Sequence, residues 1–249
     1  MDSLVSIITP TYNSGRYISE TIQSIQAQTY TNWELLITDD CSDDQTVDII
    51  MSFQKNDPRI KLFSLEINSG PGPSRNNSIR MAKGKYIAFL DSDDKWSEFK
   101  LEKQISFMQK KNYIFTFTNY FKIDSQGTII KSENNPPLKV NYTDCLLGNR
   151  IGCLTVVLDV SKLGKIYMED LPRRQDYLLW LKILKKIDYA YSINEKLAFY
   201  RVHNKSISSK KMRLVLDHWH IYRSLENHST LRSIWYLVNY IVRKILRSI

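Results

Sequence analysis

Strand and helix signals alternate through the first third of the chain, and this alternation restricts the possible fold more than any other feature. Short apolar runs typical of buried strands are separated by segments whose apolar residues recur at helical spacing. The expected strands are 4–10, 33–39, 60–66 and 85–91, and the expected helices between them are 16–28, 43–55 and 73–83. Strands separated by helices of this length form a parallel sheet with helices on both faces. The sequence therefore predicts an α/β fold.

Polar side chains follow three of these predicted strands. "PTYN" (10–13) ends the first strand, Asp39 and Asp40 end the second, and "DSDD" (91–94) ends the fourth. Ligands of open parallel sheets bind beyond the carboxyl ends of the strands, so these three clusters are expected to converge at one edge. Neighbouring carboxylates repel unless a counter-charge is present, and Mg²⁺ is typically held by one or two carboxylates plus substrate phosphates. The pattern predicts a nucleotide and metal site.

Each acidic residue also has an ordinary structural interpretation. Asp and Ser are common in turns and helix caps, so "DSDD" could be a solvated turn, and Asp94 is better explained as a cap than as a ligand. Asp40 could likewise cap the helix that follows it. The chain has no GxGxxG and no GxxxxGK[ST] motif, which excludes a dinucleotide fingerprint and a P-loop. Phosphates would therefore be held by a metal and by basic side chains.

The second half of the chain is less regular. Residues 113–130 are expected to form two strands with a turn at "DSQG", and 151–160 a further strand. An amphipathic helix is expected at 173–186, with Asp176 in its first turn, and 196–209 would be a strand that runs into a polar loop. This mixed region would add strands and a wall for an acceptor to the nucleotide-binding half.

Composition sets the class and compartment of the protein. With 249 residues, 43% of them hydrophobic, the chain can build one large domain, alone or with an appendage. Three cysteines without metal-type spacing suit a reducing cytosol. The first residues do not have the pattern of a signal peptide, and no apolar stretch is long enough for a spanning helix. We therefore expect a cytoplasmic protein.

Positive charge is concentrated at the C-terminal end. From Arg201 onward there are ten Lys and Arg against two acidic residues, so this segment contributes +8 of the net charge of +9. No nucleic-acid motif accompanies it, and no nucleic-acid partner is expected. The polar residues of the last segment recur every three or four positions, with aliphatic and aromatic residues between them: Arg232, Tyr236, Asn239, Arg243 and Arg247. The pattern predicts a helix in the interface of an anionic membrane; the alternative is a helix packed on the domain or on another subunit.

Three blocks resemble glycosyltransferase family 2. They are "VSIITPTYNSGRYISETIQSIQAQTYTNWELLITDDCSDD", "AKGKYIAFLDSDDKW" and "RQDYLLWLKIL", and they occur in the order and spacing of that family. The chain is most similar to bacterial enzymes of teichuronic acid, capsule and O-antigen assembly. The resemblance implies a GT-A fold, with a Rossmann-like, mostly parallel sheet over residues 1–208, divided into a nucleotide-binding half (1–97) and an acceptor half (98–208). Residues 209–249 would be a basic, amphipathic helical tail.

The resemblance also implies a reaction. The enzyme would transfer a hexose, with inversion, from a UDP-sugar to a hydroxyl of a polyprenyl-diphosphate-linked saccharide at the inner face of the plasma membrane. Mg²⁺ or Mn²⁺ would neutralise the leaving diphosphate. A sugar nucleotidyltransferase stays a second interpretation, although its glycine- and basic-residue-rich entry loop is missing, and a non-catalytic nucleotide- or sugar-binding module is a third.

Residue roles follow from the same resemblance. Tyr12 would stack on the donor base, Asp40 would bond its edge, and Pro10 and Ser92 would line the same donor site. Asp91 would approach the ribose, while Arg75 would contact the base or a phosphate. Asp93 would bind the metal. His203 is a further candidate near the metal or the diphosphate for a separate reason, since imidazole is a common metal ligand. Asp176 matches the catalytic base, although the first turn of a helix also favours an acid for its dipole alone.

The sequence departs from the family pattern at two positions. Cys41 stands where glycine is frequent, after the aspartate pair. Gln175 stands where glutamate usually precedes the base, so Asp176 lacks an acidic neighbour that would raise its pKa.

Overall fold

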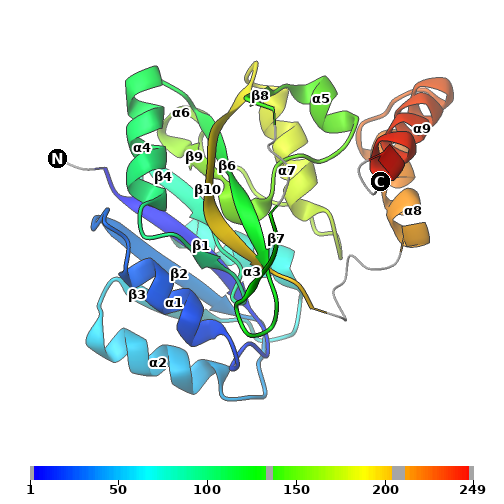
Figure 1. The fold of residues 1–249 in the computed structure, drawn as a ribbon. Coiled ribbons are helices and arrows are strands. Elements are labelled where there is room, and N and C mark those ends of the chain that lie inside the picture. The colour runs from blue at the N-terminus through cyan, green and yellow to red at the C-terminus, as the bar shows by residue number, and fades with distance from the viewer. Residues whose placement is uncertain (1–2, 133–136, 204–210, 247–249) are drawn as a thin grey trace.

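The computed structural model describes residues 3–132, 137–203 and 211–246, and it confirms the alternation predicted for the first half (Figure 1). The strands there are β1 (Val5–Thr11), β2 (Trp33–Asp39), β3 (Ile60–Ser64) and β4 (Tyr86–Phe89), and the helices between them are α1 (Ile18–Gln26), α2 (Thr46–Asn56) and α3 (Pro71–Met81). Helix α3 starts two residues earlier than predicted. Gly70 precedes it with a positive φ of 89°, and Pro71 occupies the first turn, where its missing N–H costs nothing.

The second half contains shorter elements. They are β5 (Lys95–Trp96), α4 (Lys100–Lys111), β6 (Phe115–Ile123), β7 (Ile129–Ser132), β8 (Lys139–Val140), α5 (Tyr142–Leu146), β9 (Val157–Asp159), α6 (Val160–Leu163), α7 (Gln175–Leu184) and β10 (Ala190–Arg201). The hairpin β6–β7 turns at the predicted "DSQG".

The predicted strand at 151–160 was wrong over its first half. Residues Cys153–Thr155 form a 3-10 turn, and only Val157–Asp159 are a strand. Within the turn, the backbone N–H and the hydroxyl of Thr155 both donate to the carbonyl of Gly152, at 3.0 and 2.7 Å. The indole of Trp96 donates to the carbonyl of Leu154 at 2.8 Å, so a distant side chain fixes a turn that the apolar run did not indicate.

Ten strands of the described residues form one sheet in the order β3-β2-β1-β4-β9-β6-β10-β5, with β7 beside β6 and β8 beside β10. The first four are parallel, as are β6 and β10, whereas β9 runs antiparallel to both β4 and β6. The sheet is continuous across residue 97. The nucleotide-binding and acceptor halves proposed from the sequence therefore share one sheet.

The two faces of the sheet support two separate cores. In β1, Val5 and Ile7 pack with helices α1, α2 and α4 on one face, whereas Ile8 points to the opposite face, which is covered by α3 and α7. This follows from the two-residue period of a strand. Because both faces are covered, ligands can reach the sheet only at its edges and strand ends.

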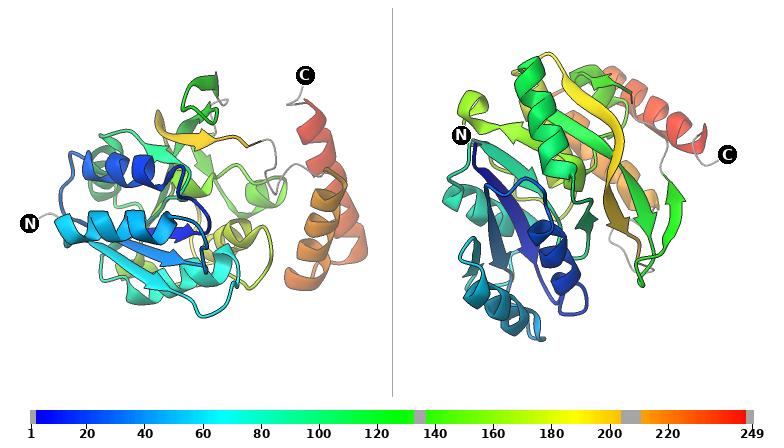
Figure 2. Two further views of the ribbon diagram at one scale, coloured as in Figure 1. Left: turned by 90° about the horizontal axis from the view of Figure 1, so that it is seen from below. Right: turned by 60° about the vertical axis from the view of Figure 1, so that its left-hand side comes forward.

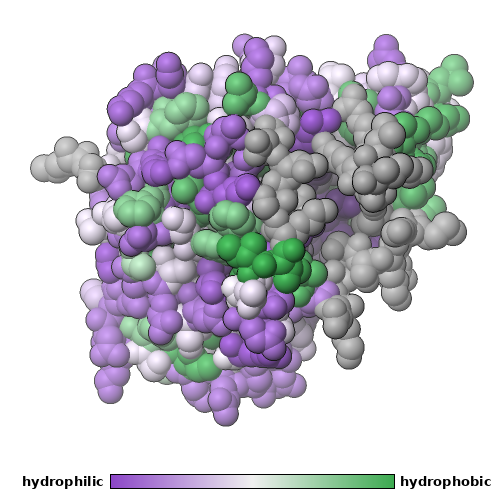
Figure 3. Space-filling view, viewed as in Figure 1, coloured by the Kyte–Doolittle hydropathy of each residue, from purple (hydrophilic) through white to green (hydrophobic). Residues whose placement is uncertain are grey.

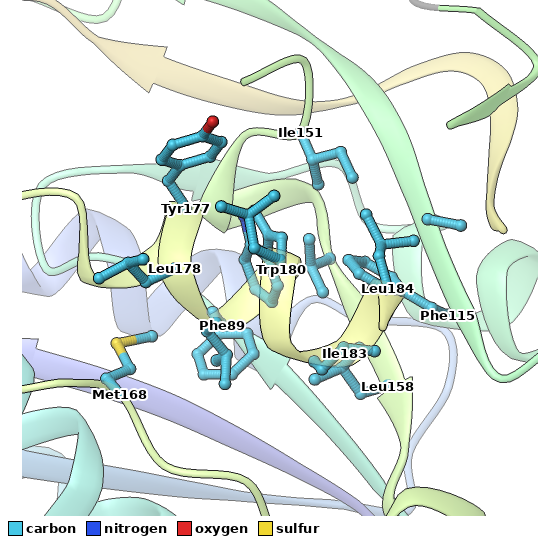
Figure 4. Packing of buried hydrophobic residues seen from close by; sticks show 14 of the residues in the cluster. Phe89, Phe115, Ile151, Leu158, Met168, Tyr177, Leu178, Trp180, Ile183 and Leu184 are labelled. Carbon is cyan, nitrogen blue, oxygen red and sulfur yellow. The ribbon is translucent and has the colours of Figure 1, made fainter. Parts of the chain in front are cut away.

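Helix α7 is more buried than an amphipathic helix, contrary to the prediction for 173–186. Eight of its ten residues are buried, on every side of the helix. The ring of Trp180 lies 5.7 Å from that of Phe89 and 5.2 Å from that of Phe115, measured between centroids (Figure 4). Large buried side chains of this kind hold a helix firmly, so the first turn that carries Asp176 is anchored in the core.

The C-terminal elements lie at one flank of the sheet. Helix α8 (Lys211–His220) continues into a π-helical turn (Ile221–Leu225), and α9 (Thr230–Leu246) packs beside α8 (Figure 2). Tyr222, in the π-helical turn, is fully buried and donates its hydroxyl to the carbonyl of Leu146 at 2.6 Å. None of the helices in the described part of the chain combines the length and the apolarity that a membrane crossing requires.

Lys100 is a charged residue in the core that has no acidic partner among the described residues. Lys100, at the start of α4, is fully buried; its ammonium donates to Gln104 Oε1 at 3.0 Å and lies 4.1 Å from the centroid of the Trp96 ring. Burial lowers the pKa of Lys100 from 10.5 to about 7. Contact with the indole face stabilises the charged form in part.

We expect this lysine to make stability depend on pH. Between pH 7 and 10.5 the unfolded chain binds a proton at Lys100 that the folded chain does not, so the free energy of unfolding rises with pH across this window. Lys100→Met should remove that dependence and stabilise the fold at pH 7 by about 1–3 kcal/mol, with a smaller gain at pH 10. Urea unfolding at pH 7 and pH 10 measures both. Equal pH slopes in the two proteins would contradict the assignment.

Candidate active site

The predicted convergence at one edge of the sheet is present. Thr11 at the end of β1 pairs with Asp39 at the end of β2, and β4 leads directly into Asp91 and Ser92. The hydroxyls of Ser14 and Ser92 are 2.7 Å apart, which joins the segment after β1 to the segment after β4. Arg75, from the first turns of α3, donates to Asp91 Oδ1 at 2.5 Å. Side chains from three strand ends and a helix therefore meet in one site.

Tyr12 lies at the surface of this site. Its side chain is 51% exposed, which excludes the alternative that it is a core aromatic residue, and leaves the ring accessible for stacking. Pro10, two residues earlier, is buried within β1. Their predicted contacts with a donor base stay predictions.

Asp40 already has hydrogen-bond partners in the protein. Its two carboxylate oxygens accept the backbone N–H groups of Ser69 and Gly70, both at 2.7 Å, so this side chain holds the loop between β3 and α3. It does not cap α2: near that helix, the carboxylate of Asp44 accepts the N–H of Thr46 at 2.9 Å. A bond from Asp40 to a base stays a prediction and would use its remaining lone pairs.

The backbone conformation at Cys41 explains why glycine is usual at this position. Cys41 has a positive φ of 66°, in the left-handed region that only glycine adopts without steric cost. Its thiol donates to the carbonyl of Leu65 at 3.3 Å, a weak bond that stabilises the conformation in part.

Cys41→Gly is therefore expected to stabilise the protein by about 0.5–1 kcal/mol, because relief of left-handed strain exceeds the entropic cost of glycine. In a chain of this size the melting temperature should rise by roughly 2–4 °C. Cys41→Ala is the matched control, since it keeps the strain and loses the thiol bond. A melting temperature that rises equally in both variants would show that the sulfur, and not the backbone, is the unfavourable part.

Asp93 and His203 form a pair at the same edge. His203 Nε2 and Asp93 Oδ2 are 2.8 Å apart, which brings together the two residues that the sequence nominated for the metal. Burial and the neighbouring charge of Asp91 raise the pKa of Asp93, while His203 opposes this rise. Asp94, in contrast, is buried and accepts the backbone N–H of Arg201 at 2.7 Å. The prediction that it caps a helix was wrong, because the N-cap residue of α4 is Phe99 and no side chain caps that helix.

Arg201 organises this turn, and the sequence reasoning missed it. Its guanidinium is fully buried: Nε donates to the carbonyl of Asp93 at 2.8 Å, and Nη2 bonds Glu20 at 2.9 Å. It also lies 4.6 Å from the ring of Tyr17, which is 5.3 Å from the ring of His203. Arg201 and His203 are two residues apart at the end of β10, so alternation along that strand was the signal that could have indicated a shared face.

The donor set of this edge fits a hard divalent cation that is shared with a substrate. Within the described part of the chain, no three His, Cys, Asp or Glu side chains are placed to hold a metal by themselves. Asp93 and His203 would supply two ligands, since His203 Nε2 and Asp93 Oδ2 are 2.8 Å apart. Burial and the charge of Asp91 raise the pKa of Asp93, so a cation beside it would stabilise its charged form. Mg²⁺ and Mn²⁺ sites with few protein ligands are completed by substrate phosphates and water.

Asp176 occupies the first turn of α7 and belongs to the same electrostatic cluster. Burial raises the pKa of Asp176; the charges of Arg75 and Arg174 oppose the rise, and that of Asp91 adds to it. The raised pKa therefore does not depend on an acid at position 175. Gln175 instead is buried, donates to the carbonyl of Leu171 and packs against Gly72 at the start of α3.

Comparison with known proteins gives the family. The model of the family described as "Glycosyl transferase family 2" matches residues 6–159, and the chain belongs to this family and is a glycosyltransferase. It is 44% identical over 237 residues to TuaG of Bacillus subtilis, a glycosyltransferase named for teichuronic acid biosynthesis, covering 95% of this chain and 94% of TuaG. It is 41% identical over 242 residues to Escherichia coli WfgD, named as a UDP-Glc:α-D-GlcNAc-diphosphoundecaprenol β-1,3-glucosyltransferase, covering 97% and 93%.

Two solved structures share the fold. S. aureus TarS in complex with UDP superposes with a TM-score of 0.70 at 22% identity, covering 95% of this chain and 70% of that one. The mannosyltransferase PcManGT from Pyrobaculum calidifontis, in complex with GDP-Man and Mn²⁺, gives a TM-score of 0.71 at 16% identity, covering 97% and 74%. The GT-A fold expected from the sequence is thereby confirmed.

Proposed function

We propose that this protein is an inverting hexosyltransferase that moves a sugar from a UDP-sugar to a hydroxyl of a saccharide carried on polyprenyl diphosphate, during assembly of a bacterial surface polysaccharide. The named acceptor of WfgD and the name of TuaG support this substrate class. The observation that most supports the proposal is the Arg75–Asp91 hydrogen bond of 2.5 Å, since the charges of both residues also act on the pKa of half-buried Asp176 in the first turn of α7.

The proposed mechanism uses one base. An acceptor hydroxyl beside Asp176 would lose its proton to that carboxylate as the oxygen attacks the anomeric carbon from the side opposite to UDP. A single displacement of this kind inverts the configuration. Asp93 and His203 would hold the divalent cation, which when bound neutralises the charge of the leaving diphosphate. Arg75 keeps Asp91 oriented toward the donor, and Tyr12 would stack on the uracil.

A panel of UDP-sugars, each incubated with Mn²⁺, tests the donor without any acceptor. The proposal predicts slow hydrolysis of one UDP-hexose and tighter binding of UDP than of GDP or ADP in calorimetry. Transfer to GlcNAc-diphosphoundecaprenol, or to another sugar on the same lipid, then tests the acceptor class. Release of pyrophosphate from a nucleoside triphosphate would instead identify a nucleotidyltransferase, and binding without any turnover would identify a non-catalytic module.

We also propose that the protein sits on the inner face of the plasma membrane through α9. One face of this helix packs inward through Ser233, Tyr236 and Leu237. The alternative predicted for the tail, a helix packed on the domain, is therefore correct for this face. Tyr236 does not belong to an exposed polar stripe, and Arg247 lies outside the described residues. The opposite face exposes an apolar row near the exposed Arg232, and green surface is visible at the right-hand margin of Figure 3. The residues of this row are Leu231, Ile234, Trp235, Val238, Ile241 and Val242.

Outer-face substitutions test this membrane contact better than truncation, which would also remove the inward-packed face. Trp235→Ser with Val238→Ser should weaken binding to liposomes that contain anionic lipid by about tenfold or more, since two apolar anchors are lost. Met51→Ser with Ile67→Ser is the matched control, because these exposed residues lie on other elements. High salt should weaken binding only in part, as apolar contact is not screened. If the wild-type protein does not bind such liposomes, α9 is a subunit contact instead, and sedimentation should detect a dimer.

A further inference from the structure

A cavity of about 390 Å³ lies between the segment that precedes α7 and helix α8. Part of its wall is apolar, and Leu216 at this wall is 66% exposed. The remainder is polar and mostly basic, with two arginines and a histidine facing one aspartate. The apolar part is lined by Leu171, Pro172, Leu216 and Ile221, and the polar part by Arg173, Arg174, Asp217 and His220.

The charges of the two arginines have different roles. Arg173 is paired with Asp217 through two hydrogen bonds of 3.0 Å, so its charge is compensated and the pair fastens α8 to the segment before α7. Arg174 has no such carboxylate partner among the described residues. His220 is exposed at the end of α8 and adds ring nitrogens to the same wall. The cavity therefore combines an apolar surface with a guanidinium that, among the described residues, forms no ion pair with a carboxylate.

This cavity is close to the candidate base. Arg174 and Asp176 are two residues apart, so their Cα atoms lie within about 7 Å of each other. The guanidinium acts on Asp176 directly, since its charge opposes the rise that burial causes in the pKa of that carboxyl. Arg174 has a positive φ of 65°, which turns the chain sharply at the start of α7. A ligand in the cavity would thus be a near neighbour of a sugar whose hydroxyl contacts Asp176.

We propose that this cavity binds the diphosphate of the lipid-linked acceptor and the first part of its hydrocarbon chain, an inference that rests on the function proposed above. In an acceptor with a single sugar, as in the named acceptor of WfgD, the diphosphate is attached to the same ring as the reacting hydroxyl and would lie one sugar width from the base. Arg174 and His220 would contact its oxygens, because a guanidinium binds phosphate through paired, charge-assisted hydrogen bonds. The apolar wall would receive the hydrocarbon, which then continues past α8 toward the exposed face of α9 (Figure 2).

Binding of farnesyl diphosphate tests the cavity directly, since this probe carries the diphosphate and an isoprenoid chain but no sugar. Calorimetry is done without divalent metal, so that the Asp93 edge does not capture the diphosphate. Arg174→Gln should weaken binding by about tenfold or more, whereas Lys186→Gln, which removes a charge from the exposed far end of the same helical segment, should not change it. Equal affinities for wild type and Arg174→Gln, or no binding by wild type, would overturn the inference.

Kinetics separate a diphosphate contact from an effect through the base. With GlcNAc-diphosphoundecaprenol, Arg174→Gln should raise KM by about tenfold or more; with an alkyl glycoside of GlcNAc that lacks diphosphate it should not. An altered pKa of Asp176 would affect both acceptors alike, and that outcome would also overturn the inference. If no acceptor is glycosylated but farnesyl diphosphate binding depends on Arg174, the proposed function fails while the cavity assignment stands. If the wild-type enzyme transfers sugar equally fast to the acceptor with diphosphate and to the alkyl glycoside, the transferase activity stands and the cavity assignment fails.

Discussion

Asp176→Asn should lower turnover by roughly a hundredfold or more while UDP binding stays within about twofold of wild type. The substitution keeps the size of the side chain and removes its capacity to accept a proton. The first turn of α7 is held by Tyr177, Leu178 and Trp180 in the core, so the fold should be preserved. Single-turnover assays with saturating donor and acceptor measure the chemical step, and calorimetry with UDP measures binding.

The pH profile gives a second readout of the same residue. Burial raises the pKa of Asp176 above its ordinary value of 3.8, so the base loses activity by protonation as pH falls through this raised value. Wild-type kcat/KM should therefore show an acidic limb that is absent from the residual activity of Asp176→Asn. Asp170→Asn, at an exposed acid of the preceding segment, serves as control and should keep both rate and profile. Near-normal turnover of Asp176→Asn would assign the base elsewhere, with Asp91 and Asp94 tested next.

Asp93→Asn should abolish transfer to the limit of detection and remove the contribution of Mn²⁺ to UDP binding. The amide is a poor ligand for a hard cation, and the diphosphate of UDP then meets Asp91 and Asp94 without a neutralising metal. The fold should persist, because Arg201 bonds the backbone carbonyl of Asp93 and not its side chain. Titration of Mn²⁺ in the presence of UDP, followed by calorimetry, measures the lost affinity.

Two further variants define how the metal is held. His203→Gln should reduce Mn²⁺ affinity by about tenfold without abolishing transfer, since it removes or reorients a single ligand. Asp43→Asn, at an exposed acid in the loop after β2, should change neither property. Full activity of Asp93→Asn in buffer freed of divalent metal would refute the metal assignment, whatever the behaviour of His203→Gln.

Local pattern was sufficient to predict the first half of the fold. The strand at 33–39 is buried along its whole length because both faces of the parallel sheet are covered, and its central residues are apolar. The helices between the strands keep a clear period. The convergence of Tyr12, Asp91 and Asp93 followed from the rule that parallel strands end at one edge. His203 was a candidate only because imidazole is a common metal ligand, and its pairing with Asp93 was not predicted, as the two residues are separated by 110 positions.

What local pattern did not predict depends on long-range contacts. The turn at Cys153–Thr155 is fixed by Trp96, and Arg201 is buried because its guanidinium joins Glu20 to the carbonyl of Asp93. Asp40 was interpreted from its neighbours in the chain, whereas its partners are Ser69 and Gly70 in a different loop.

The burial of α7 on every side has a consequence for how such an enzyme can acquire a new acceptor. Substitutions between Tyr177 and Leu184 alter the core and cost stability before they alter recognition, since eight of the ten residues in this helix are buried. Variation that survives selection should therefore collect in 171–174 and in 215–217 of α8, where side chains are at least partly exposed. Libraries for directed evolution of acceptor choice belong in these two segments, and the helix that bears the base is best left unchanged.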